Sequence, residues 1–224
     1  MELDFSYLQR HWEMIAHGLV VTIVLSISSI AIGFVLGTLM AIARRSSIRI
    51  LSAATAAYVE MIRNTPLLIQ IFLTFFGLSM LGLRLPATLV AVLAMTVNTV
   101  AYTSEIVRAG FDSIKPGQWE AADSLGLNRA QAYWHVALLP AIERVYPSLS
   151  SQFVLLMLAT SITSQISVED LTAVANFLQA QSYRPFETYI VTALLYLALS
   201  LLLRLVLWGI GRALFTRSRA MAAA

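Results

Sequence analysis

The stretch GLVVTIVLSISSIAIGFVLGTLMAIA, residues 18–43, runs without a single charged side chain. About 20 predominantly apolar residues are enough to cross the hydrocarbon core of a bilayer as a helix. The stretch therefore predicts a transmembrane helix, and its G-x-x-x-G pair, Gly33 and Gly37, predicts the close approach of a neighbouring helix. Three further uncharged stretches are residues 64–83, 85–104 and 145–168, and a fifth, residues 188–211, is interrupted only by Arg204.

The whole chain has the composition of an integral membrane protein. Of its 224 residues, 58% are hydrophobic and 12% are charged, whereas soluble domains carry about 25% charged residues. An unusually apolar soluble helical bundle is the alternative, but the apolar residues come in long blocks, which favours a membrane protein. We expect an all-α protein with one transmembrane domain, residues 1–224, and five spans at about residues 18–43, 52–83, 85–107, 145–168 and 187–211.

The distribution of Lys and Arg predicts the orientation of the chain, because the cytoplasmic loops of membrane proteins carry an excess of these residues. Basic residues follow the first span, occupy the region between the third and fourth spans, and end the chain, whereas the opposite face holds few. The first group is Arg44, Arg45, Arg49, Arg108, Lys115, Arg129, Arg144, Arg212, Arg217 and Arg219, and the second is Arg10, Arg84 and Arg184. We expect the N-terminus outside and the C-terminus in the cytoplasm.

The sequence gives no support for a metal site, a nucleic-acid-binding site, a nucleotide phosphate site or a catalytic site. There is no cysteine, and the three histidines (His11, His17 and His135) lack ligand spacing, so we expect no metal site. The net charge of +3 comes from basic residues at the ends of spans, so we expect no nucleic acid partner. The phosphate-binding pattern G-x-x-x-x-G-K-[ST] is absent. No polar catalytic cluster is found either, and we expect this chain not to be an enzyme.

Two features modify the spans. Pro66 lies in the second span, where it removes a backbone hydrogen bond and predicts a kink, and Asn64 and Thr65 can satisfy the freed backbone groups. Residues 167–185 are polar for a position between two spans, yet they carry apolar side chains at helical spacing. We expect a short amphipathic helix there, lying at the outer surface.

The longest polar, helix-forming stretch is EAADSLGLNRAQAYWHVALLP, residues 120–140. Its first residues favour a helix, and Gly126 suits the left-handed conformation that ends one. Asn128 can cap a second helix, which we expect to end at Pro140. The result is a helix–turn–helix in a cytoplasmic loop at residues 112–142. An ordinary loop or a DNA-binding unit could share this pattern, but the element is short, nearly neutral and tied to the bilayer at both ends.

The same stretch resembles the EAA loop of permease subunits of ATP-binding-cassette (ABC) importers, in which Glu-Ala-Ala is followed by Gly and then by an aliphatic residue, Leu and Pro. Glu120-Ala121-Ala122, Gly126 and Leu138-Leu139-Pro140 match that pattern. The resemblance extends to polar amino acid permeases, such as those for histidine, arginine, glutamine or glutamate. It rests on GLVVTIVLS (18–26), YVEMIRNTPLLIQIF (58–72), AYTSEIVRAGFDSIKPGQWEAA (101–122) and RPFETYIVTALLYLALS (184–200). It covers nearly the whole chain and implies the type I importer permease fold in a bacterial inner membrane.

The resemblance implies that the loop transmits the closure of a separate ATPase pair to the spans. A helix joined at both ends to transmembrane helices can do this. Small alanines keep one face slim, and the charge of Glu120 can meet a partner's arginine or cap its own helix; a simple first-turn helix charge is the alternative for Glu120. The implied coupling residues are Gly117, Glu120, Ala121, Ala122, Leu125, Gly126, Leu139 and Pro140.

Polar side chains inside the spans are candidates for two roles. Glu60 and Arg63, and likewise Glu105 and Arg108, are three residues apart, so we expect two ion pairs that support the loop, in preference to substrate contacts. Residues for the translocation path are Asn98, Gln152, Thr160, Ser161, Ser164 and Gln165, although each could equally serve hydrogen bonding between helices. Many relatives have Lys-Asp where this chain has Leu158-Ala159 before Thr160, which favours a non-identical permease partner that supplies the substrate contacts.

We therefore expect the transmembrane subunit of an ATP-driven importer of a polar amino acid, without a cofactor of its own. The implied partners are an ABC ATPase dimer that binds ATP and Mg, a second permease subunit in a heterodimer rather than a homodimer, an extracytoplasmic amino-acid-binding protein, and membrane lipid. The alternatives are a secondary amino acid transporter, which predicts midplane carboxylates and usually an inverted repeat, and a non-transport membrane scaffold, which needs no coupling loop.

Overall fold

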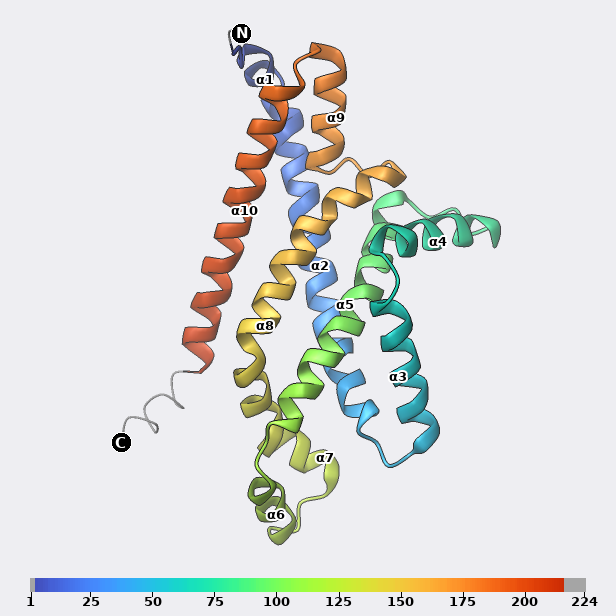
Figure 1. Cartoon of the computed structure of the whole chain (residues 1–224), viewed down its shortest axis with the longest axis vertical. Coiled ribbons are helices and arrows are strands. Elements are labelled where there is room, and N and C mark those ends of the chain that lie inside the picture. The colour runs from blue at the N-terminus through green and yellow to red at the C-terminus, as the bar shows by residue number, and fades with distance from the viewer. Residues whose placement is uncertain (1–2, 216–224) are drawn as a thin grey trace.

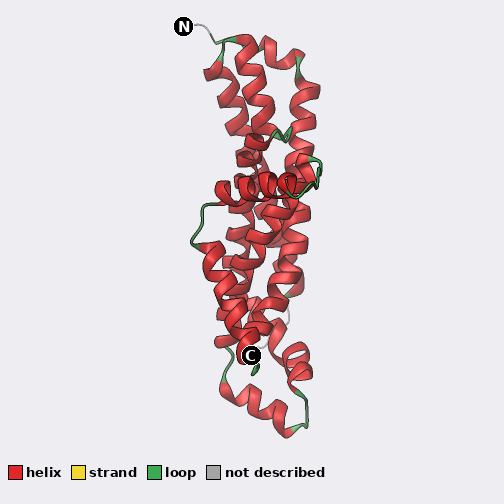
Figure 2. Ribbon diagram, turned by 90° about the vertical axis from the view of Figure 1, so that its right-hand side faces the viewer, coloured by secondary structure: helices red, strands yellow, loops and turns green. Residues whose placement is uncertain are grey.

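The computed structural model describes residues 3–215, and within that range every regular element is a helix (Figure 1, Figure 2). Arg217 and Arg219 of the expected basic C-terminus lie outside the described residues. The elements are α1 (Ser6–Arg10), α2 (Trp12–Arg44), α3 (Arg49–Arg63), α4 (Leu67–Met80), α5 (Ala87–Asp112), α6 (Pro116–Ser124), α7 (Arg129–Gln131), the π-helical turn η1 (Ala132–Ala137), α8 (Leu138–Ala159), the 3₁₀ segment η2 (Thr160–Ile166), α9 (Leu171–Ser182) and α10 (Pro185–Leu214).

Four helical stretches of the described chain are long and apolar enough to cross a membrane: Trp12–Arg44, Ala87–Asp112, Arg129–Ile166 and Pro185–Leu214. They run along the long axis of the molecule (Figure 1). The helices α3 and α4 pass the same test only as a pair, and a bend of 107° separates them. The expected second span, residues 52–83, is therefore two helices, of which α4 lies across the bundle (Figure 1).

The bend at Pro66 follows from backbone chemistry. Proline has no N–H and keeps the preceding residue out of the helical conformation, and Pro66 itself is extended, with φ −59° and ψ 137°. The carbonyls freed at the end of α3 are satisfied locally, as expected from the sequence. The Asn64 side chain donates to the Glu60 carbonyl at 2.8 Å, and the Thr65 hydroxyl donates to the Met61 carbonyl at 2.7 Å.

The tightest packing in the fold is between α2 and α5. A Cβ added to Gly33 would lie 2.5 Å from Cβ of Thr99, and one added to Gly37 would lie 2.7 Å from Cβ of Thr103. Real side chains never come so close, so both positions need glycine. The G-x-x-x-G pair of α2 thus packs against a T-x-x-x-T pair on α5, which confirms the close helix approach expected for Gly33 and Gly37.

The helix α9 differs from its expectation in what it packs against. Leu171, Val174 and Leu178 form its apolar face, as the spacing predicts, but they are buried against Leu8 and Ile15 of α1 and α2. The helix stands beside α2 and α10 instead of lying flat on a lipid surface (Figure 1). The apolar face is covered by protein because the long α2 and α10 extend beyond the other spans at this end.

Candidate functional site

The loop between α5 and α8 has the helix–turn–helix form expected from its sequence. Pro116 occupies the first turn of α6, a position where its missing N–H costs nothing. Gly126 has φ +71°, and its N–H donates to the Asp123 carbonyl at 2.9 Å, which ends the helix. Asn128 and Gln131 form a capping box with bonds of 3.0 and 2.9 Å, so Asn128 caps the second helix as predicted.

The second helix does not end at Pro140, contrary to the sequence-based expectation. It continues through the π-helical turn η1 into α8, with Pro140 in the first turn of α8. A π turn bonds five residues back instead of four. The last such bond of η1 runs from the Leu138 N–H to the Tyr133 carbonyl, and Pro140 follows in α8 without ending the helix. The loop and the following span are therefore one continuous helical stretch, Arg129–Ile166.

The coupling residues implied by the family resemblance separate into two faces of α6. Ala122 is buried, 1% exposed, and packs inward. Gly117, Glu120 and Ala121 are exposed at i, i+3, i+4 spacing, which places them on one outer face of the helix. Beyond the helix end, Leu125 is 77% exposed, and Gly126 forms the turn. Leu139 is exposed and Pro140 is half-buried, both at the start of α8.

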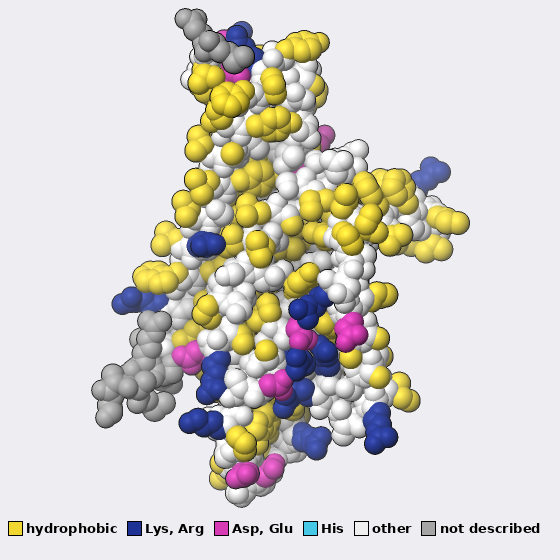
Figure 3. Space-filling view, viewed as in Figure 1, with side chains coloured by type: hydrophobic (Ala, Val, Ile, Leu, Met, Phe, Trp, Pro, Cys, Tyr) yellow, Lys and Arg dark blue, Asp and Glu magenta, His cyan; other side chains and the backbone are white. Residues whose placement is uncertain are grey.

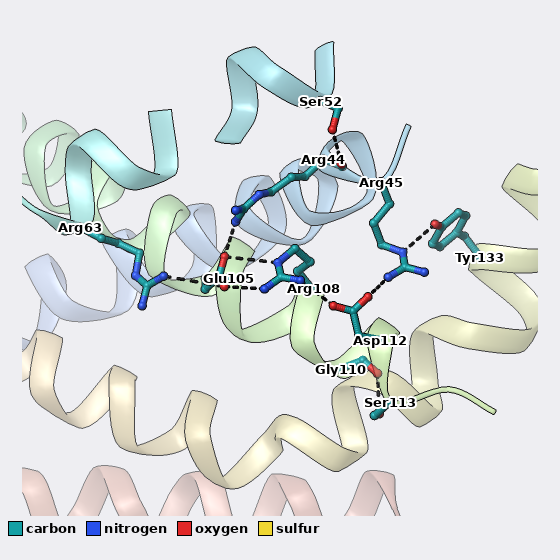
Figure 4. Close-up of polar contacts among 10 residues, drawn as sticks. All are labelled: Arg44, Arg45, Ser52, Arg63, Glu105, Arg108, Gly110, Asp112, Ser113 and Tyr133. Carbon is teal, nitrogen blue, oxygen red and sulfur yellow. Dashed lines mark hydrogen bonds and ion pairs between the residues drawn. The ribbon is translucent and has the colours of Figure 1, made fainter. Parts of the chain in front are cut away.

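Tyr133 of η1 joins this loop to the membrane helices. Its ring lies edge to face with the rings of Trp119 in α6 and Phe111 in α5, with centroid separations of 5.0 and 5.2 Å. Its hydroxyl accepts a hydrogen bond of 3.1 Å from Nε of Arg45 at the end of α2. One aromatic side chain therefore contacts α6, α5 and the end of α2, and Figure 4 shows its bond to Arg45.

An ion network lies at the same end of the molecule. The Glu105 carboxylate accepts from Arg44, from Arg108 at 2.6 Å, and has Arg63 at 3.8 Å (Figure 4). The side chains of Arg44 and Glu105 are only 17% and 23% exposed. Charge-assisted bonds of this kind are stronger than neutral ones, and partial burial reduces their screening.

The second carboxylate of the network is Asp112, the last residue of α5. It accepts from Arg108 at 2.5 Å and from Arg45 (Figure 4). Arg108 thus bridges the two acids, and Arg45 connects Asp112 to Tyr133. The network is continuous from Arg63 on α3 to Tyr133 in the loop between α5 and α8.

The structure corrects one of the two expected ion pairs. Glu105 and Arg108 are paired, but Arg63 turns toward Glu105 and toward the Tyr102 ring, 5.6 Å from its centroid. Glu60 is exposed and belongs to no ion pair among residues 3–215. Arg63 is the last residue of α3, where the chain turns away, and its guanidinium reaches α5 instead of the preceding turn.

Sequence reasoning missed four members of this cluster: Arg44, Arg45, Asp112 and Tyr133. The basic pair was used only to orient the chain. The i,i+4 spacing of Arg108 and Asp112 is the signal that could have found one of them. The contacts of the other three residues join helices far apart in the sequence, and no local sequence pattern predicts such contacts.

A polar groove lies beside the α3–α4 break, with a volume of about 470 Å³. Two of the predicted path residues, Asn98 and Gln152, line it together with Arg63 and Tyr102. Asn98 donates to Gln70 at 3.0 Å, so part of its polar capacity is used within the protein.

Gln70 is a further residue that sequence reasoning missed. Its amide group donates to the carbonyls of Ile62 and Thr65 at 2.7 and 2.9 Å, and its oxygen accepts from Asn98. These bonds satisfy backbone groups at the break, and Gln70 is itself buried. The groove wall is therefore held by a short hydrogen-bonded chain between α3, α4 and α5.

The other four predicted path residues lie apart from this groove, in η2. Thr160 is fully buried and donates to the Met157 carbonyl at 2.7 Å. Ser161 and Ser164 donate to backbone carbonyls three residues before them, both at 2.8 Å, and Gln165 is exposed. None of these four residues lines the groove, although η2 begins directly after the lining residue Ala159.

The family model described as "Binding-protein-dependent transport system inner membrane component" matches residues 33–216. The probable glutamine ABC transporter permease protein GlnM of Bacillus subtilis (strain 168) is 37% identical over 199 residues, which cover 89% of this chain and 92% of that protein. The L-cystine transport system permease protein TcyB of the same organism is 36% identical over 199 residues, covering 88% and 85%.

Two solved structures share the fold. A crystal structure of an amino acid ABC transporter with histidines matches with a TM-score of 0.85 and 35% identity, over 95% of this chain and 100% of that chain. The inward-facing MetNI methionine ABC transporter matches with a TM-score of 0.72 and 18% identity, over 95% and 99%. With a family model that spans most of its length and relatives above one-third identity, this chain belongs to the family of inner membrane components of binding-protein-dependent transport systems.

Proposed function

We propose that this chain is the transmembrane subunit of an ATP-driven importer for a polar amino acid. Relatives named for glutamine, cystine, octopine and arginine transport support this class of substrate. The chain acts as one domain with a second, non-identical permease subunit, and an extracytoplasmic binding protein delivers the amino acid. An ABC ATPase dimer binds ATP and Mg on the other side. The family resemblance implies a charged pair where this chain has the uncharged Leu158-Ala159, and this difference supports the heterodimer.

The exposed face of α6 is the proposed contact with the ATPase, and it is the observation that carries the proposal. Glu120 presents its carboxylate there, beside the small Gly117 and Ala121. The inner face is held by buried Ala122 and by the Trp119–Tyr133 contact. A helix packed on one side and free on the other can move as a unit with a bound partner.

Motion of α6 reaches the spans through the ion network. Tyr133 contacts Arg45, Arg45 pairs with Asp112, and Arg108 joins Asp112 to Glu105. Arg63 follows at 3.8 Å and lines the polar groove. In the proposed mechanism, closure of the ATPases shifts this connected set and with it the groove wall at the α3–α4 break.

The polar groove is the proposed part of the translocation path on this subunit. Asn98 and Gln152 offer amide groups to the substrate, and the groove volume of about 470 Å³ can hold an amino acid. Thr160, Ser161, Ser164 and Gln165 lie further along the chain in η2, and their hydroxyls and amide are proposed to line the path beyond it.

The proposed location is a bacterial inner membrane, with the coupling loop and C-terminus in the cytoplasm. Lys and Arg side chains gather over the lower half of the molecule, the end that holds α6 (Figure 3). The absence of cysteine allows a clean test with single cysteine variants. A membrane-impermeant thiol reagent should label Tyr183→Cys, 88% exposed between α9 and α10, in intact spheroplasts. It should label Leu125→Cys only in inside-out vesicles, and the reverse pattern contradicts the orientation.

The coupling proposal is tested by reversing the charge of Glu120. Glu120→Lys should weaken retention of the co-expressed ATPase on the purified permease by about tenfold or more, because a favourable charge contact becomes repulsive, and uptake should fall with it. Glu13→Lys is the matched control, since Glu13 is also exposed on a helix but lies at the opposite end. Wild-type ATPase retention and uptake in Glu120→Lys would overturn the proposal.

A further inference from the structure

A second groove, of about 440 Å³, lies between α8 and α10. It shares no lining residue with the polar groove beside the α3–α4 break. Tyr146 of α8 is one of its lining residues, and the Tyr146 hydroxyl donates to the Leu207 carbonyl of α10 at 2.6 Å. The hydroxyls of Ser150 and Ser151 line one wall and Arg204 the other. The groove therefore combines a cation with several hydrogen-bond donors.

Arg204 is unusual for its position in α10. Its neighbours Leu201, Leu202 and Leu205 are all more than half exposed, and the most apolar window of this helix is 0% buried within the described chain. No ion pair among residues 3–215 includes Arg204. A charge on an apolar, outward-facing helix surface is costly in a bilayer and requires a partner or access to the headgroups.

The composition of the groove indicates which partner fits. Among residues 3–215, the charged residues that line the groove are two arginines, Arg204 and Arg212, and one carboxylate, Glu143. Trp208 lies between the two arginines on α10, and the Arg212 guanidinium is 5.4 Å from its ring centroid. Trp and Tyr are enriched at the level of lipid headgroups. In Figure 3, basic side chains lie on the side of the molecule that holds α10, with apolar side chains beside them.

We propose that this groove binds the phosphate headgroup of an anionic phospholipid from the leaflet on the coupling-loop side. The Arg204 guanidinium donates to the phosphate oxygens, a geometry that its planar fork matches. The serine hydroxyls donate to the same headgroup. The acyl chains lie along the exposed leucines of α10, and this apolar continuation distinguishes a lipid from a free anion. Basic pockets between membrane helices are known to take such headgroups.

The proposal is tested by native mass spectrometry of the detergent-solubilised permease with its co-purified subunits. Phosphatidylglycerol and phosphatidylcholine with identical chains are added separately to wild type, Arg204→Ala, Arg204→Lys and Arg49→Ala. Arg49 is the matched control, because it is an exposed arginine at the start of α3 and does not line the groove. Wild type should retain phosphatidylglycerol in preference to phosphatidylcholine. Arg204→Ala should reduce that preference about fivefold, the contribution of one basic residue, with Arg204→Lys in between and Arg49→Ala unchanged.

Three results would overturn the proposal. The preference for phosphatidylglycerol could persist in Arg204→Ala. Millimolar inorganic phosphate could displace the lipid completely, which would identify a free-anion site. Arg204→Ala could instead lose a permease partner while keeping its lipid, which would make the groove a protein interface. Because the substitution makes an exposed face more apolar, the variant is expected to fold, and its unfolding temperature provides the check.

Discussion

Glu105→Gln is the most direct test of the ion network. The substitution keeps the shape of the side chain but removes the negative charge shared by Arg44, Arg108 and Arg63. A hydrogen bond to a charged group contributes about 1.5–3 kcal/mol, and the two close contacts would lose most of that. The amide oxygen retains one neutral acceptor, and the carboxylate is 23% exposed, so screening reduces the loss. We expect a destabilisation of about 2–3 kcal/mol.

The assay is thermal unfolding of the purified permease in detergent, followed by tryptophan fluorescence. For a protein of this length, 1 kcal/mol shifts the midpoint by about 2–4 °C, so the expected decrease is about 4–12 °C. Glu60→Gln is the control: Glu60 is an exposed carboxylate outside the network, and its change should stay within about 0.5 kcal/mol. A midpoint for Glu105→Gln within about 2 °C of wild type, or an equal loss for Glu60→Gln, would refute the reasoning.

Three further variants test other parts of the fold. Gly33→Ala should lower stability by about 1–3 kcal/mol, because the new Cβ meets Thr99 at 2.5 Å. The control Gly77→Ala, whose Cβ meets nothing within 4 Å, should be neutral or stabilising. Equal thermal unfolding midpoints for the two variants would contradict the packing. Gln70→Leu should lower the free energy of unfolding by about 2–3 kcal/mol, because two backbone carbonyls at the α3–α4 break lose the Gln70 amide as their donor. A limited-proteolysis pattern identical to that of wild type would argue against this role of Gln70. Burial raises the pKa of Asp170 above its ordinary value, so the folded state binds the proton more tightly than the unfolded state, and this contribution to stability is lost as pH rises from about 4. Asparagine can still cap α9 at this position, so Asp170→Asn should flatten the dependence of unfolding temperature on pH. An unchanged slope would exclude Asp170 as its source.

The sequence alone determined the membrane character of the chain and the shape of the loop between α5 and α8. Long uncharged runs such as residues 18–43 leave few alternatives, because backbone groups in lipid must be satisfied within a helix. The turn at Gly126 and the cap at Asn128 depend on the conformations of single residues and their near neighbours. A break near Pro66 follows from the missing N–H, and its local donors, Asn64 and Thr65, were correctly expected.

Only the tertiary structure decided which distant groups meet. Arg44 and Glu105 are 61 residues apart, and nothing local distinguishes Glu105 from Glu60, whose carboxylate remains exposed. The size of the bend, 107° between α3 and α4, is set by packing against α5 and by the Gln70 side chain, since proline removes a bond without fixing a direction. The apolar face of α9 was visible in its spacing, but whether lipid or protein covers it depends on how far α2 and α10 extend. Local preferences act within a few residues, whereas partners across helices are chosen when the whole bundle packs.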